Sequence, residues 1–379
     1  MKTIVAHPSL NSAGGGEIVC LSFIRLLQKA GYQVCLVTVD RTDWIRLRRI
    51  FGGIATPNDE RYLLPALPPM YFSFMSSLLT LVFFVTELLL ANLVKGNSLL
   101  VSTCGEKINS LADLTYVNGI PLRCTPVLSN VSAKRRCYGS AYDICLRLID
   151  WISPSMIISN SEFTRLVIRK CMKRETPVIH PPVDLRRILC EKESAAGERG
   201  NVVVVASRFL PDQDLNRVLE IAKKVENIEF KMVGPAGSSS EETIDYLKKR
   251  ILDLGLNSRV QILTNQPSSI FRELLLSSKV FLRTLPHESF GISVIEAMAA
   301  GCVPVVPMDG GPWFDILEQK QGFYGYAFRD DEEASRIIRS LMDNENLRAE
   351  VSSRSFERAL KLARPVFEET IPKILKAIR

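Results

Sequence analysis

The chain has 379 residues, of which 46% are hydrophobic and 23% charged, and its net charge is +7. These proportions exclude a disordered tail, a collagen-like repeat and a disulfide scaffold, and the length predicts two compact domains. The positive charge is concentrated at the start, because residues 1–183 carry 20 Lys and Arg against 12 Asp and Glu, whereas residues 184–379 carry 28 against 29. A basic first half suits an anionic partner such as phosphate or lipid head groups. We expect no nucleic-acid partner, since the short Arg clusters contain no interleaved aromatic residues.

The numbers and spacing of Cys and His residues argue against disulfide bonds and a metal site. The nine Cys are an odd number without a Cys-x-x-Cys pair, and there are three His. This pattern is atypical of a disulfide framework or a zinc site. The chain opens with the strand-like run Thr3-Ile4-Val5-Ala6 rather than with a basic region and a cleavable apolar stretch. We therefore expect a cytoplasmic protein in a reducing compartment.

The first half of the chain alternates strand-like and helix-like segments. A strand pattern at Thr3–His7, a helix pattern over Glu17–Ala30 and a second strand pattern at Gln33–Asp40 form a β-α-β unit. Further strands are expected at Leu99–Thr103, Thr115–Val117 and Met156–Ser159. This alternation predicts a Rossmann-like domain with a largely parallel sheet over residues 1–183, ending near Pro181-Pro182.

The segment Tyr71–Val94 is strongly apolar: 17 of its 24 residues are hydrophobic, and its one charge is Glu87. Its length permits a membrane span, but a crossing would place strands of one sheet on opposite sides of the bilayer. We therefore expect no span. Two interpretations stay open, a helix packed inside the domain and a helix that dips into a membrane surface, and the basic charge of the domain favours the second.

The second half repeats the alternation, which predicts another Rossmann-like domain over residues 184–364. A helix follows at 365–379, and whether it returns to the first domain stays open. We expect two doubly wound domains that face each other across a cleft, with ligands at the carboxyl ends of their strands. The expected strands are Val202–Ser207, Glu229–Val233, Val260–Leu263, Val280–Leu282 and Val303–Pro307, and the expected helices are Leu215–Val225, Glu241–Gly255, Phe271–Leu276, Ile292–Ala300, Glu332–Asp343 and Asn346–Ala363.

A glycine-rich loop joins the first strand to the first helix. In Asn11–Glu17, glycine lets the backbone approach a ligand while free N–H groups at the helix start attract an anion, so the loop suits a phosphate. The loop lacks the Gly-x-Gly-x-x-Gly spacing of dinucleotide-binding proteins, and the chain has no phosphate loop ending in Gly-Lys-Ser or Gly-Lys-Thr. These absences argue against a dehydrogenase and a P-loop enzyme.

Two carboxylates stand eight residues apart in the segment His287–Gly301. If a helix begins near Ile292, Glu288 lies in the loop before it and Glu296 in its second turn, so both can face one ligand. The free N–H groups at the start of that helix attract an anion.

At His287–Gly301 the chain resembles the retaining glycosyltransferases of family 4 (group 1), which have the GT-B fold and carry a Glu-x7-Glu motif followed by an Ala-Met-Ala-x-Gly helix end. His7-Pro8, the glycine loop and His287-Glu288 look most like the mannosyltransferases that lengthen lipid-linked oligosaccharides from GDP-mannose on the cytosolic face of a membrane. The resemblance extends over nearly the whole chain, through Asn160–Thr164, Val178–Asp184, Ser207–Pro211, Met232–Pro235 and Gly310–Pro312.

The resemblance implies a membrane-associated glycosylation enzyme. A hexose moves from a nucleotide-sugar to a lipid-linked glycan with retention of configuration, without a cofactor or metal, at the cytosolic membrane surface. The implied catalytic residues are Glu288, which holds the donor sugar, and Arg208, which binds the diphosphate. Glu296 binds the ribose hydroxyls. The other implied donor-binding residues are Gly15, Gly16, Gln213, Gly234, Phe290, Gly291 and Ile292, and His7 and Asn118 face the acceptor or have no assigned role.

Two positions depart from the family pattern: Gln213 stands where the family usually has Lys, and Asn118 where members often have His. Two alternatives therefore stay open. One is a non-catalytic GT-B subunit that binds a sugar nucleotide or glycan lipid, and the other is a soluble glycosyltransferase for small molecules. The acidic triplet Asp212-Gln213-Asp214 resembles a metal-binding Asp-x-Asp, but Asp214 is better placed to cap a helix that starts at Leu215.

Overall fold

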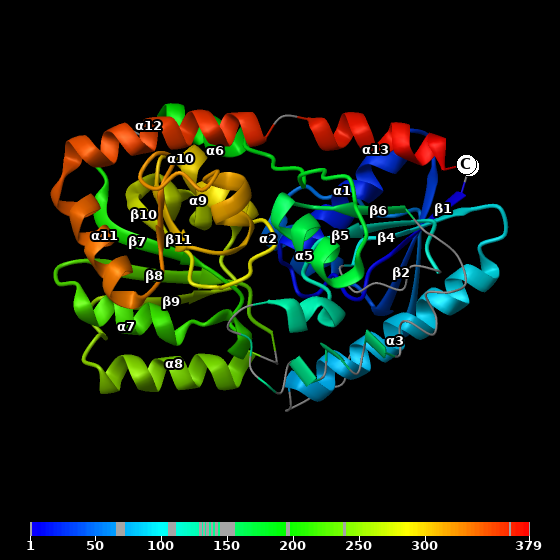
Figure 1. The fold of residues 1–379 in the computed structure, drawn as a ribbon, viewed down its shortest axis with the longest axis horizontal. Coiled ribbons are helices and arrows are strands. Elements are labelled where there is room, and N and C mark those ends of the chain that lie inside the picture. Colours follow the sequence, from blue (N-terminus) through cyan, green and yellow to red (C-terminus); the bar gives the residue numbers. More distant parts are fainter. Residues whose placement is uncertain are drawn as a thin grey trace. The chain divides into compact units, whose positions relative to one another are not determined.

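A computed structural model describes residues 2–65, 73–104, 111–128, 131, 133, 136–137, 139–140, 143–144, 156–194, 198–237, 240–363 and 365–378, without the side chains of 73–81, 94 and 212. The chain forms two compact units. Unit 1 comprises Met1–Arg48, Gly53–Pro182 and Pro365–Arg379, and unit 2 comprises Arg49–Gly52 and Val183–Arg364 (Figure 1).

Unit 1 is built on a six-stranded sheet in which every neighbouring pair is parallel. In spatial order its strands are β3 (Asp59–Leu64), β2 (Gln33–Asp40), β1 (Lys2–Ala6), β4 (Leu99–Ser102), β5 (Leu114–Val117) and β6 (Met156–Ser159). The order reverses between β1 and β4, which is the arrangement that opens a ligand crevice beyond the strand ends. The helices are α1 (Gly15–Lys29), α2 (Trp44–Phe51), α3 (Ser73–Val94), a 3₁₀ turn at Leu122–Val127, α5 (Glu162–Met172) and α13 (Val366–Ala377). The end of α2, from Arg49 on, is assigned to unit 2.

The last helix of the chain belongs to the core of unit 1. Phe367 of α13 packs edge-on against Phe23 of α1 and Tyr116 of β5, with ring centroids 5.0 and 5.6 Å apart. The Tyr116 hydroxyl donates to the carbonyl of Ile179 at 2.7 Å. Edge-on aromatic pairs contribute about 0.5–1.5 kcal/mol each beyond the area they bury, so α13 is held to this unit by specific packing.

Helix α3 covers the opposite face of this sheet with one side and exposes apolar residues on the other. Phe84, Leu88 and Ala91 are buried against β1, β2 and β4. Glu87 lies on the same buried side, where burial first and then the nearby Asp40 carboxylate raise its pKa to about 8. The exposed residues are Val82 (51%), Leu89 (44%), Leu90 (51%) and Leu93 (80%). Within the part of the chain that the structure describes, no helix is long and apolar enough to cross a membrane.

Unit 2 repeats the same strand order. Its sheet runs β12 (Tyr326–Phe328), β11 (Val303–Pro307), β10 (Ser278–Leu282), β7 (Gly200–Ala206), β8 (Glu229–Gly234) and β9 (Val260–Thr264), again with parallel neighbours. The order reverses between β7 and β10. The helices are α6 (Arg186–Ser194), a 3₁₀ turn at Pro211–Gln213, α7 (Asn216–Lys224), α8 (Glu241–Asp253), α9 (Ser268–Ser277), α10 (Ile292–Ala300), a π-helical turn at Pro312–Ile316, α11 (Asp331–Asp343) and α12 (Glu345–Leu362).

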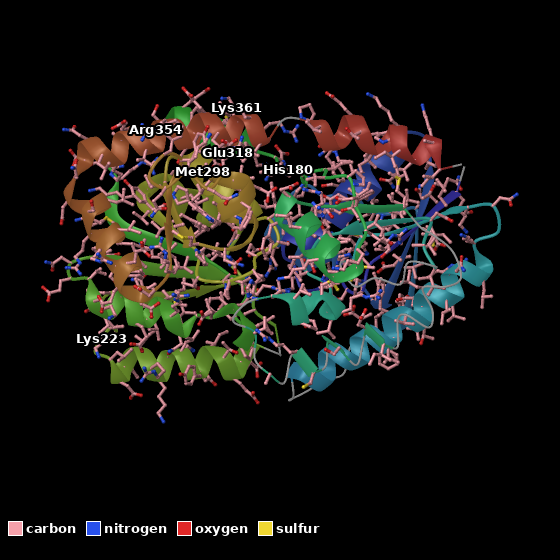
Figure 2. All side chains as sticks on the ribbon, in the orientation of Figure 1. His180, Lys223, Met298, Glu318, Arg354 and Lys361 are labelled. Carbon is pink, nitrogen blue, oxygen red and sulfur yellow. The ribbon has the colours of Figure 1, made fainter. Side chains whose placement is uncertain are left out.

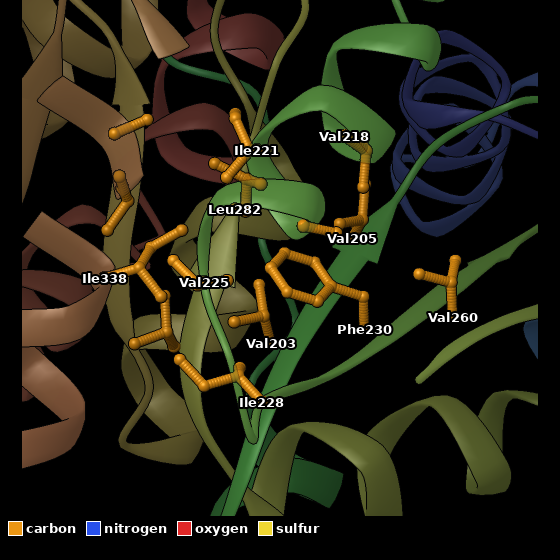
Figure 3. Close-up of a cluster of buried hydrophobic side chains, with 14 of the residues drawn as sticks. Val203, Val205, Val218, Ile221, Val225, Ile228, Phe230, Val260, Leu282 and Ile338 are labelled. Carbon is orange, nitrogen blue, oxygen red and sulfur yellow. The ribbon is translucent and has the colours of Figure 1, made fainter. Parts of the chain in front are cut away.

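Alternate residues of the strands in unit 2 feed two hydrophobic cores, because successive side chains point to opposite faces of a sheet. Val203 and Val205 join Phe230 beneath α7, α8 and α11 (Figure 3). Val204 joins the other core, beneath α9 and α10, where Met298 is fully buried. Figure 2 labels Met298 within this helical layer, and Lys223 and Lys361 as exposed side chains of α7 and α12.

The two parallel sheets with flanking helices confirm the predicted fold class. Strand β12 and helix α6 were not predicted, and neither was β3, because its sequence Asp-Glu-Arg-Tyr-Leu-Leu lacks a buried apolar run and it lies at the sheet edge. The proposed helix cap by Asp214 is wrong. Asp214 has a left-handed backbone (φ 54°), and α7 begins without a side-chain cap. Its carboxylate lies 3.9 Å from the guanidinium of Arg217 instead.

Candidate active site

The candidate site of unit 2 lies where its strand order reverses. Ser207 and Arg208 directly follow β7, and Arg283 directly follows the neighbouring strand β10. Residues at the carboxyl ends of these two strands border the crevice in which open parallel sheets bind ligands. The loop with Glu288 and the start of α10 come a few residues after β10, so the topology brings the two predicted motifs to one edge.

A glycine turn holds the backbone around Glu288. The N–H of Gly311 donates to the carbonyl of Glu288 at 2.7 Å. A Cβ on Gly310 would lie 2.7 Å from that same oxygen, and one on Gly311 would lie 2.3 Å from the carbonyl oxygen of Ser289. Gly310 has a φ of +78° as well. The loop thus needs glycine at both positions, which gives a steric reason for the Gly310-Gly311 pair.

The ends of the same loop are also fixed. His287 has a left-handed backbone (φ 56°), and its Nδ1 lies 2.5 Å from a carboxylate oxygen of Asp309. Gly291 has a φ of +104° and precedes α10, whose start carries no side-chain cap. An uncapped helix start leaves N–H groups free for an anion.

Glu288 is the acidic residue of this loop, and its side chain is 21% exposed. Its Oε2 pairs with Nη2 of Arg283, whose own side chain is 10% exposed. Nη1 of Arg283 donates to the carbonyl of Ala206 at the end of β7, at 2.7 Å. Arg283 was not predicted as a site residue. The available signal was its position, since a cation directly after a buried strand lies at the ligand edge of a parallel sheet.

Glu296 lies in the second turn of α10, where the sequence motif placed it, and is partly buried. Its pKa is raised to about 7, mainly by burial, with the carboxylate of Asp184 adding to the rise and the guanidinium of Arg272 opposing it. A carboxyl group that titrates near neutral pH is typical of a functional site.

The end of β7 brings three more predicted residues together. Arg208 is partly buried, and its guanidinium has no hydrogen-bond or ion-pair partner among the described residues. Gln213 is 2% exposed, and its Oε1 accepts from the hydroxyl of Ser207 at 3.2 Å. Gly234, at the end of β8, packs so closely that a Cβ there would lie 1.7 Å from the carbonyl oxygen of Ser207.

Two predicted donor-binding residues are chiefly part of the core. The Phe290 side chain is 2% exposed and belongs to the hydrophobic cluster under α10. Ile292 packs partly buried against the same cluster. A ligand can therefore contact Phe290 only at its backbone groups, not at its buried ring.

The predicted residues of unit 1 converge beside the glycine loop. A Cβ on Gly16 would lie 3.9 Å from both Cε1 of His7 and Cβ of Asn118. Nδ1 of His7 lies 2.9 Å from the hydroxyl of Thr103, and the Asn118 amide donates to the Thr103 carbonyl at 2.7 Å. His7 follows β1 and Thr103 follows β4, so this cluster also lies where the strand order reverses.

Glu17 completes this cluster and was not predicted. Its Oε2 accepts from the N–H of Gly14 at 2.7 Å, which caps the start of α1, the helix that Gly15 begins. Its Oε1 lies 3.6 Å from Nε2 of His7. The sequence signal was the acidic residue three positions into the helix, which is the capping-box position.

Comparison with known proteins identifies the family of unit 2. Residues 189–358 match the family model described as glycosyl transferases group 1. The chain carries a group 1 glycosyltransferase domain. This finding confirms the family that the motifs His287–Gly301 and Ser207–Pro211 indicated.

Relatives and solved structures cover the transferase domain and unit 1. The GDP-Man:Man(3)GlcNAc(2)-PP-Dol alpha-1,2-mannosyltransferase of Xenopus tropicalis is 25% identical over 383 residues, which cover 85% of this chain and 77% of that protein. The human protein of the same name is 26% identical over 184 residues, which cover 44% of this chain and 36% of that protein. The crystal structure of Anabaena HepE in complex with UDP and glucose superposes with a TM-score of 0.71 at 17% identity and covers 100% of both chains. That structural likeness confirms the GT-B fold.

Proposed function

We propose that the protein transfers mannose from GDP-mannose to a lipid-linked glycan with retention of configuration. The observation that carries the proposal is the joint position of Arg208, Glu288 and the start of α10 at the strand reversal of the transferase domain. The relatives named as GDP-mannose-dependent mannosyltransferases support the choice of donor and acceptor. The neighbour solved with UDP and glucose supports a nucleotide-sugar in this fold.

The leaving group sets the main chemical demand on the site. A nucleoside diphosphate departs with two or three negative charges, which need fixed positive charge and N–H donors. Arg208 has its guanidinium unengaged among the described residues, and the uncapped start of α10 offers N–H groups. These groups suit diphosphate without a metal, which is part of the proposal.

The two carboxylates suit the sugar hydroxyls. A carboxylate accepts hydrogen bonds from two neighbouring hydroxyls, so Glu296 suits the ribose and Glu288 the transferred sugar. Glu288 has one oxygen engaged by Arg283, which leaves Oε1 for a ligand. A hydrogen bond to an ionised group contributes about 1.5–3 kcal/mol, which corresponds to about a 10- to 100-fold change in rate if it is made in the transition state.

A donor and acceptor screen tests this function. The purified protein is titrated with GDP-mannose, UDP-glucose, UDP-N-acetylglucosamine and the free nucleotides, with and without a polyprenyl-linked glycan. We expect GDP-mannose to bind and to turn over only with the acceptor, and the product linkage to keep the configuration of the donor. Binding of nucleotides without turnover under any acceptor would favour the non-catalytic alternative, which the neutral, buried Gln213 motivates. Turnover with a water-soluble acceptor alone would favour the small-molecule transferase.

The membrane part of the proposal rests on α3. Val82, Leu89, Leu90 and Leu93 follow helical spacing along one face and are each at least 44% exposed. This apolar face belongs to the basic half of the chain, so apolar insertion and attraction to acidic lipids act together. This pairing supports a peripheral position on the cytosolic surface of a membrane.

Vesicle co-sedimentation tests the membrane contact. The triple variant Leu89→Ser, Leu90→Ser, Leu93→Ser is expected to lose binding to vesicles that contain acidic phospholipid. Leu252→Ser is the matched control, because Leu252 is 67% exposed on α8 of the other unit. Equal binding of the triple variant and the wild type would contradict the role of α3.

A further inference from the structure

Arg283 is a buried cation at the switch point of the transferase domain. It follows β10, and its side chain is 10% exposed. A buried guanidinium is destabilising unless it is paired and hydrogen-bonded. We therefore expect the groups around the guanidinium of Arg283 to pair with it.

One hydrogen-bond partner of Arg283 is distant in the sequence and the other is near. Nη1 is bound to the carbonyl of Ala206, 77 residues earlier, and Nη2 to Oε2 of Glu288. Its Nε is buried without a hydrogen-bond partner in the described part of the chain. The guanidinium is thus placed where it binds the Ala206 carbonyl and the Glu288 carboxylate, although its own Nε–H then lacks an acceptor among the described residues.

This contact fixes how Glu288 can meet a ligand. Arg283 takes Oε2, so Oε1 is the oxygen left to accept from a sugar hydroxyl. A carboxylate held at one oxygen cannot rotate freely, which keeps the other oxygen in one direction.

The pair also balances charge beside the phosphates. Glu288 alone would repel a diphosphate bound at Arg208 and the start of α10. With Arg283 in contact, the Glu288–Arg283 pair is neutral, and Arg208 contributes net positive charge. The sugar-binding carboxylate and the diphosphate can then lie at the same edge of the sheet without strong repulsion between them.

We infer that Arg283 is a positioning residue of the transfer reaction, which orients Glu288 for the donor sugar and neutralises it beside the diphosphate. The inference rests on the proposed function and goes beyond it by assigning a role to a residue outside the family motif. It predicts that Arg283 acts on sugar recognition through Glu288 rather than through the stability of the fold.

A double-mutant cycle tests this role. The variants are Arg283→Met, Glu288→Gln and the two combined, and the readout is the ratio of the dissociation constants for GDP and GDP-mannose. We expect each single change to lower this preference for the sugar-bearing ligand by about tenfold, the effect of one charge-assisted hydrogen bond. The combined variant is expected to show no further loss, because Arg283 acts through Glu288.

Arg348→Met is the matched control for loss of a buried arginine. Arg348 has an 8% exposed side chain, pairs with Glu345 on α12 and also has a buried Nε without a partner among the described residues. We expect this variant to lose thermal stability and to keep the wild-type preference for GDP-mannose over GDP.

The outcomes separate the two claims. Additive losses in the combined variant, or an unchanged preference in Arg283→Met, would overturn the role of Arg283 while the wild type still binds GDP-mannose. An equal loss of preference in Arg348→Met would overturn it as well, since the effect would then follow from stability alone. A wild type that binds no nucleotide-sugar would overturn the proposed function, and the role of Arg283 with it.

Discussion

Gly234 is the position where a single added methyl group should disturb the site most directly. A Cβ there would lie 1.7 Å from the carbonyl oxygen of Ser207 and 2.8 Å from its carbonyl carbon. Ordinary contact between carbon and a carbonyl oxygen begins at about 3.3 Å. Gly234→Ala therefore has to separate the ends of β7 and β8 by roughly 1.5 Å, and Arg208 is the next residue after Ser207.

The expected loss is larger for function than for stability. Overpacking costs about 1–3 kcal/mol, which lowers the Tm of a domain of this size by about 2–12 °C. A displacement of about 1 Å in a reacting site costs about 100-fold in rate. We therefore expect kcat/KM to fall by about 100-fold and the affinity for GDP to fall by at least about tenfold, because the displaced backbone carries Arg208.

Gly237→Ala is the matched control three residues further on. A Cβ on Gly237 meets no atom within 4 Å, so this variant should bind GDP within about twofold of the wild type. Calorimetric titration with GDP, a thermal melt and steady-state rates are measured for both variants. Wild-type affinity in Gly234→Ala, or equal losses in both variants, would refute the steric argument.

Three further predictions use the other site groups. As the pH falls from 8 to 6, Glu296, whose pKa is about 7, takes up a proton, and the wild type should lose affinity for GDP. Glu296→Gln should not show this loss. Parallel pH profiles of the two proteins in calorimetric titration would contradict the role of Glu296 at the ribose. Glu87 has a folded-state pKa of about 8, above its ordinary value of 4.5, so the native state holds the extra proton and stability falls as the pH rises through this window. Glu87→Gln should therefore gain stability over the wild type from pH 4.5 to 8 and hold that gain above pH 8, whereas a gain in urea midpoint that is independent of pH would show that Glu87 does not titrate there. Addition of EDTA should leave turnover unchanged, and a loss restored by Mn²⁺ would contradict the proposal of transfer without metal.

Local patterns in the sequence predicted the elements of the core. The bounds of β2, β6, β11 and α10 agree with those expected, because buried apolar runs and the left-handed Gly301 at the end of α10 are visible locally. Strand β3 was missed because its pairing with β2, rather than its own charged sequence, makes it a strand. Edge strands of this kind carry little local signal.

The sequence predicted those residues of the candidate site that belong to recognisable motifs. Glu288, Glu296 and Arg208 were named from the family pattern, and the structure puts them at the carboxyl edge of one sheet. Arg283 depends on a contact with Ala206 across 77 residues, so its role needed the fold. The same holds for Thr103, which meets His7 across 96 residues.

The most direct test of the proposed reaction site compares the wild type with Glu288→Gln in mannose transfer from GDP-mannose to a polyprenyl-linked glycan. Glu288→Gln leaves the charge of the buried Arg283 without its carboxylate partner, so the variant should lose thermal stability, and transfer is compared at a temperature at which both proteins are folded. We expect acceptor-dependent transfer by the wild type and a loss of at least about 100-fold in the variant. Transfer by Glu288→Gln at the wild-type rate would contradict the assignment of this loop as the site of the reaction.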